Sequence, residues 1–119
     1  MGRLTRTTAP ALTPARRIQQ AERAHWWACD SLRTIARNAA KENAERAEYL
    51  TAARLDVATA VRAWGLHAEG TAKAIRHAHA VEDATEWCAE DYSRHLANAR
   101  ATVELRAHEL AEARAAATA

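Results

Sequence analysis

Two long stretches without proline or glycine constrain this fold more than any other feature of the sequence. They run from Ile18 to Trp64 and from Thr71 to Ala117. In both, apolar residues recur every three or four positions, as they do along one face of a helix. The segment between them, 65–70, begins and ends with glycine, which tolerates the backbone conformations of a chain reversal. We therefore predict an all-α fold, a long antiparallel helical hairpin or two-helix coiled coil.

The expected limits of the helices follow from residues with strong terminal preferences. Thr13 followed by Pro14 is typical of a helix start, because threonine caps the first turn and proline lacks an N–H that would have no partner there. Gly65 can end the first helix, and Gly70 with Thr71 can cap the second. The predicted organisation is a flexible basic arm over 1–13 and a hairpin over 14–119, made of a helix over 14–64, a turn over 65–70 and a helix over 71–117.

The two apolar stripes share one register. Facing residues have numbers that add up to 135, as for Leu32 and Val103, so the stripes form a common seam when the chain reverses. In the middle of this seam Asn43 falls opposite Tyr92, and we interpret this polar pair as a device that fixes the register. Further residues expected on the seam include Ala36, Ala47, Trp64 and Ala107.

Large apolar residues off the seam are the predicted partner-binding residues. They are Trp26, Trp27, Tyr49, Trp87 and Leu105, with Leu55 beside them. A two-helix hairpin buries only one stripe per helix, and tryptophan and tyrosine supply much of the energy where proteins bind. We expect self-association into a homodimer or higher oligomer, with two hairpins forming a four-helix bundle. The alternative is a helix broken at Asp30 or Asp83, which would let the chain fold over some of these aromatics.

Basic residues raise nucleic-acid binding as an alternative function. The candidate contacts are Arg3, Arg6, Arg16 and Arg17 in and near the arm, and Arg33, Arg37 and Lys41, which are spaced by four along the first helix. Such residues can contact phosphates. However, the net charge is only +2, and fifteen arginines against two lysines in an alanine-rich chain are the pattern expected from the codon usage of a G+C-rich genome.

A metal–carboxylate site of the ferritin-like kind is the second alternative. Glu22 and His25 have the Glu-x-x-His spacing of such sites, one helical turn apart. A di-iron bundle also needs glutamates that project inward from the facing helix, whereas the seam expected there holds Leu32, Val103 and Leu110. We therefore predict neither a metal nor another cofactor, and keep Glu22 and His25 as the only ligand candidates.

Catalysis has no recognisable basis in this sequence. The only serines, Ser31 and Ser93, fall in helical stretches outside any glycine-flanked elbow, and no glycine-rich phosphate loop is present. The chain is thus expected to be a non-enzymatic protein–protein interaction or assembly module, and a structural component of a phage or bacterial particle would fit its features.

The expected location is the cytoplasm, or a virion for a phage protein. The first fourteen residues lack the apolar core of a signal peptide, and no run of about 20 apolar residues predicts a membrane span. Cys29 and Cys88 would lie about 27 Å apart along the hairpin, too far for a disulfide, and free thiols suit a reducing compartment.

Overall fold

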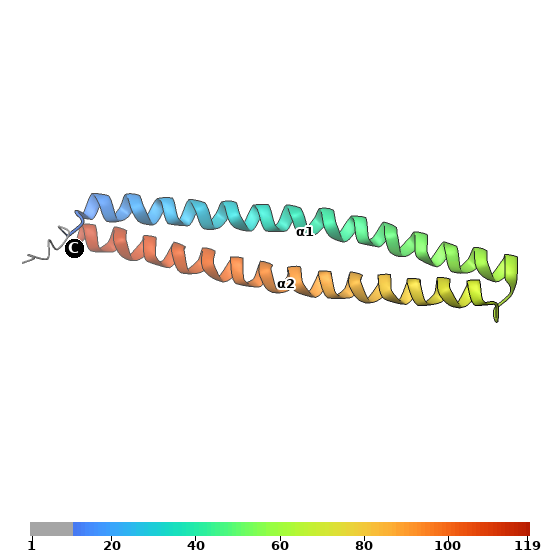
Figure 1. Ribbon diagram of the computed structural model, residues 1–119. Helices are drawn as coiled ribbons and strands as arrows, with labels where there is room; N and C mark the ends of the chain where they lie inside the picture. The colour runs from blue at the N-terminus through green and yellow to red at the C-terminus, as the bar shows by residue number, and fades with distance from the viewer. Residues whose placement is uncertain (1–10) are drawn as a thin grey trace, which may run out of the picture.

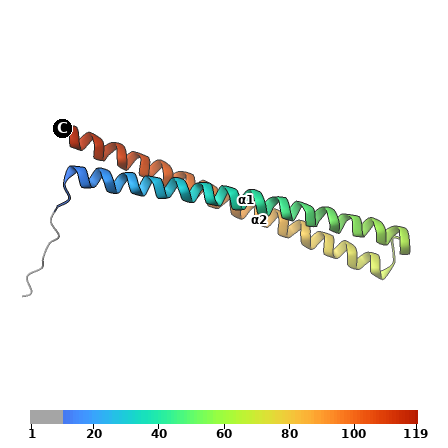
Figure 2. The same cartoon turned by 90° about the horizontal axis from the view of Figure 1, so that it is seen from above.

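Two long helices lie antiparallel along their whole length in the computed structural model, which describes residues 11–119 (Figure 1). Helix α1 spans Pro14–Trp64 and helix α2 spans Glu69–Thr118. The C-terminus lies beside the start of α1, and the view from above shows the helices crossing near their middle (Figure 2). The predicted all-α hairpin is confirmed. Both helices are continuous, so the alternative of a break at Asp30 or Asp83 is wrong.

The start of α1 has the geometry that its sequence predicts. The Thr13 hydroxyl accepts a hydrogen bond from the backbone N–H of Arg16 at 3.2 Å, and Pro14 occupies the first helical position. At the other end, Gly65 has a φ of 85°, a left-handed value that side chains with a Cβ disfavour. Its N–H still donates to the Val61 carbonyl, 2.9 Å away, so glycine ends the helix and turns the chain.

The second helix begins two residues before its predicted start. Its N-cap is Ala68, which offers no side-chain hydrogen bond, and Gly70 lies inside the first turn. Thr71 does not cap the helix, because its hydroxyl donates to the Gly65 carbonyl at 2.7 Å. Thr71 is also fully buried. The threonine therefore fastens the turn to the first turn of α2.

The interior of the hairpin is thin. Within residues 11–119 the buried side chains are Ala28, Ala39, Ala53 and Ala60 of α1 and Thr71, Cys88 and Leu110 of α2. Most of them are small, which lets the two helices approach closely but removes little apolar surface from water. Across the described part of the chain, neither helix is long and apolar enough to cross a membrane.

Contacts between the helices confirm the predicted register to within one residue. Tyr92 donates to the Glu42 carboxylate at 2.6 Å, and Arg114 lies 3.4 Å from Glu22. The numbers of these pairs add up to 134 and 136. The predicted pairing of Asn43 with Tyr92 is wrong, because Asn43 is exposed and Glu42 takes its place.

Other seam positions also differ from the prediction in a regular way. Ala36, Ala47 and Ala107 are exposed, whereas the residues just before them, Ile35, Arg46 and Arg106, are half-buried. The alternation of three and four residues thus continues onto long polar side chains, whose aliphatic stems can lie against the facing helix. Trp64 also departs from the seam and is 65% exposed, because the hairpin ends beside it.

Candidate interaction surface

The predicted partner-binding residues all lie on the outside of the hairpin. The exposed fractions are 53% for Trp26, 57% for Trp27, 62% for Tyr49 and Trp87, 59% for Leu55 and 52% for Leu105. The alternative in which the chain folds over these side chains is therefore wrong. Leu66 is 60% exposed and was not predicted as a surface residue. Its position in the turn that connects the two helices could have indicated this exposure.

Two neighbouring tryptophans form the largest aromatic group on α1. The ring centroids of Trp26 and Trp27 are 4.9 Å apart, and their planes meet edge to face at 83°. Consecutive residues of a helix diverge by about 100°, so the rings cover two adjoining strips of the outer surface. This pair leaves a large apolar area in water that a partner can cover.

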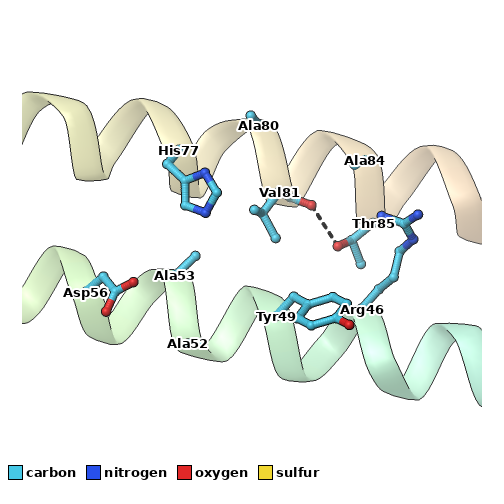
Figure 3. Close-up of a pocket in the computed structure, with 10 residues that line it drawn as sticks. All are labelled: Arg46, Tyr49, Ala52, Ala53, Asp56, His77, Ala80, Val81, Ala84 and Thr85. Carbon is cyan, nitrogen blue, oxygen red and sulfur yellow. Dashed lines mark hydrogen bonds between the residues drawn. The ribbon is translucent and has the colours of Figure 1, made fainter.

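An apolar hollow lies between the helices on one side of the hairpin. Its volume is about 430 Å³, and Figure 3 shows its lining side chains. Tyr49 and Ala53 contribute from α1, and Val81 and Ala84 contribute from α2. Tyr49 lies along α1 at the edge of the hollow, beside Arg46, with most of its surface in solvent.

Further hollows follow the same side of the hairpin, which we call the groove face. On α1 they are lined in succession by residues seven apart: Arg17, Ala24, Ser31, Asn38 and Glu45. On α2 the matching residues, also seven apart, are His95, Thr102 and Glu109. A spacing of seven keeps residues on one face of a helix. Tyr49, four residues after Glu45, brings the apolar hollow onto this face as well.

A polar cluster crosses the seam near the middle of the hairpin. The hydrogen bond to Glu42 raises the pKa of Tyr92 above its ordinary value, with burial and the negative charge of Glu42 adding to the effect. Arg46 lies 3.6 Å from Glu42, and its buried Nε has no hydrogen-bond partner. Buried polar groups cost stability but select one alignment of the helices. The cluster therefore does what the Asn43–Tyr92 pair was expected to do.

The basic residues fall into two groups. Arg3 and Arg6, with most of the predicted arm, lie outside the described residues, while Arg16 and Arg17 belong to the first turn of α1. The second group is Arg33, Arg37 and Lys41, which are exposed along α1. Within residues 11–119, none of these three residues forms a salt bridge.

The two metal-ligand candidates have separate partners. Glu22 lies 3.4 Å from Arg114, whereas His25 Nε2 lies 3.6 Å from the Cys29 sulfur. In the part of the chain that the structure describes, no three His, Cys, Asp or Glu side chains are grouped to hold a metal ion. Glu22 and His25 are therefore not brought together with a further ligand among residues 11–119.

The surface of residues 11–119 combines two kinds of side chain. Its apolar side chains are large and exposed, and its polar clusters consist of ordinary helix-surface pairs such as His108 with Glu112. No known family model matches the chain, and neither a curated protein nor a solved structure matches it.

Proposed function

We propose that this chain is a non-enzymatic interaction and assembly module whose partner is a second copy of itself. One observation carries the proposal: a hairpin with a thin interior of mostly small residues exposes Trp26, Trp27, Tyr49, Trp87 and Leu105. Apolar surface left in water is unfavourable by about 25 cal/mol per Å². Association of two hairpins into a four-helix bundle would remove much of that cost.

The size of the hairpin supports this proposal. A helix of 51 residues is about 77 Å long, and two helices side by side are about 20 Å wide. One face therefore offers about 1,500 Å², roughly twice the 800 Å² per partner of a standard stable interface. A second copy has enough surface to bind even if only part of the face is covered.

The biological setting that we propose is structural. A self-associating hairpin is a suitable repeating unit of a phage or bacterial particle, in which copies of one chain contact each other many times. The arginine-rich, lysine-poor composition is compatible with a G+C-rich phage or bacterial genome.

Nucleic-acid binding is a second candidate function, favoured by the exposed row of Arg33, Arg37 and Lys41. Three like charges spaced by four destabilise a helix unless an anion offsets them, and phosphates would do so. Retention on duplex DNA that weakens with salt and is lost in Arg33→Gln/Arg37→Gln would support this candidate. Binding that these substitutions leave unchanged would remove it.

Light scattering tests the principal proposal. We expect the wild-type chain to have the mass of a dimer or higher oligomer, and Trp26→Ala/Trp27→Ala to shift the mass toward that of the monomer. The matched control is Trp64→Ala, which removes an equally exposed tryptophan at the end of α1. An unchanged mass in the double variant would remove the aromatic interface.

A further inference from the structure

We propose that two copies stack groove face on groove face, antiparallel, about a two-fold axis near Asn38 of α1 and His95 of α2. In this arrangement Trp27 contacts Tyr49 of the partner subunit, and Trp87 contacts Leu105 of the partner subunit. The inference rests on the proposed self-association and adds the surface, the direction and the pairs of residues.

Trp27 and Tyr49 are large apolar residues that α1 contributes to the groove face. Trp27 lies between Ala24 and Ser31, three residues after one and four before the other, and both line hollows of this face. Tyr49 itself lines the apolar hollow. Residues three and four apart are neighbours on a helix surface, so both aromatics border the groove.

Trp87 and Leu105 have the same relation to the groove on α2. Trp87 follows Ala84, which lines the apolar hollow, by one helical turn. Leu105 follows Thr102 by three residues and precedes Glu109 by four, and both of these line hollows. The groove face therefore carries two large apolar side chains on each helix.

These four side chains form two patches at different heights along the hairpin. Because facing residues add up to about 135, Trp27 is level with Leu105 to within three residues, and Tyr49 is level with Trp87 to within one. The midpoint between Trp27 and Tyr49 is residue 38, and the midpoint between Trp87 and Leu105 is residue 96. Those two midpoints add up to 134, so they face each other across the seam.

A two-fold axis at this common midpoint makes the face complementary to itself. Rotation about an axis across the hairpin places Trp27 on the partner's Tyr49 and Leu105 on the partner's Trp87, and symmetry repeats both contacts. An interface with two-fold symmetry requires this kind of self-complementary patch. Each dimer would thus cover eight large apolar side chains that are more than half exposed in the single hairpin.

Charge decides between the antiparallel arrangement and a parallel one. Parallel stacking would also bring the patches together, but it would place Glu45 over Asp91 of the partner subunit. Glu45 and Asp91 are already level with each other in one hairpin, so parallel stacking gathers four carboxylates, and like charges repel. Arg94 lies 3.4 Å from Asp91 and offsets part of this charge, whereas Glu45 has no salt bridge within residues 11–119. In the antiparallel stack Glu45 lies over Ser31 of the partner subunit, and Asp91 lies over the partner's Ala101.

Cross-linking between single cysteines tests the direction. In a Cys29→Ser/Cys88→Ala background, Asn38→Cys places two thiols beside the antiparallel axis, whereas Leu66→Cys places them about 80 Å apart, at opposite ends of the dimer. We expect a short bismaleimide to give a covalent dimer with the first variant and not with the second. A covalent dimer with Leu66→Cys, whether or not Asn38→Cys also gives one, would establish a parallel dimer and overturn the inference, and so would the absence of a covalent dimer with Asn38→Cys.

Dissociation constants test the pairs of residues. We expect Trp27→Ala and Trp87→Ala each to weaken the dimer about 10- to 30-fold, in the range of interface hot spots. Trp64→Ala is the matched control: Trp64 is 65% exposed at the end of α1, outside both patches, and its loss should leave the dimer unchanged. A dimer that all three substitutions leave unchanged would overturn this inference and keep self-association, whereas a monomeric wild type would overturn both.

Discussion

Thr71→Val isolates the contact that fastens the turn to α2. The substitution keeps the shape of the side chain and removes the hydroxyl that donates to the Gly65 carbonyl at 2.7 Å. Thr71 is fully buried, so valine would occupy the same enclosed space, and the Gly65 carbonyl would keep from the protein only a longer contact of 3.4 Å from the Ala68 N–H. A lost hydrogen bond at such a site costs about 1–2 kcal/mol.

Thermal unfolding monitored by circular dichroism measures this loss. For a chain of this length, 1–2 kcal/mol lowers Tm by about 4–8 °C, provided that the protein concentration is held constant because the proposed association contributes to Tm. Thr51→Val is the matched control. The Thr51 hydroxyl donates to the Ala47 carbonyl at 3.0 Å, but the residue is exposed and water can replace it, so a change below about 0.5 kcal/mol is expected. Equal shifts in the two variants would refute the role assigned to Thr71.

Three further predictions concern the polar cluster and the turn. The raised pKa of Tyr92 means that the folded state holds the phenol proton more tightly than the unfolded state. The protonated phenol therefore contributes its full stabilisation of the folded state below about pH 10, and this stabilisation is lost as pH rises through the folded pKa. Urea unfolding at pH 8 and pH 11 should therefore show a smaller fall in stability for Tyr92→Phe than for the wild type, and an equal fall would contradict this coupling. Gly70→Ala places a Cβ 2.8 Å from the Trp64 ring, so the substitution should not stabilise the wild-type chain. In a Trp64→Ala background the contact is absent, and the higher helix propensity of alanine should stabilise the chain by about 0.5–1 kcal/mol. Equal effects in both backgrounds would exclude the contact. Gly65→Ala imposes a side chain on a φ of 85° and should cost about 1–2 kcal/mol in the same assay, whereas an unchanged midpoint would show that the turn adopts another conformation.

The fold could be predicted from the sequence because its determinants are local and repeated. Long runs without helix breakers, a capped start at Thr13 and a glycine at the chain reversal each lead independently to the same hairpin. The start of α2 was harder to predict, because threonine often caps helices and Thr71 lies where a cap is expected. Only the tertiary contact with Gly65 shows that its hydroxyl is used elsewhere.

The middle of the seam could not be read correctly from hydrophobicity. A search for apolar residues selects Ala36 and Ala47, whereas the structure turns Glu42 and Arg46 toward the facing helix. A polar residue on a seam is favourable only if the opposite helix offers a partner, and Tyr92 is that partner for Glu42. Pairing across 50 residues leaves no local signal in the sequence.

The exposed aromatics were predicted from their distance to the seam, because that distance depends only on helical periodicity. Periodicity also predicts that Trp26 and Trp27 point to opposite flanks of the seam, but it does not predict which flank carries the groove, since that depends on which residues line it. Ser31 and Asn38 have no feature that distinguishes them in the sequence, yet they define the groove face on which Trp27 and Tyr49 lie.

Sedimentation equilibrium of the unmodified chain tests the central claim most directly, because it measures mass without regard to shape. An elongated hairpin that associates through its exposed aromatic residues should sediment at twice its 13.1 kDa monomer mass or more, and should dissociate on dilution. A mass of 13.1 kDa at every protein concentration, up to about 100 times a micromolar dissociation constant, would contradict the account.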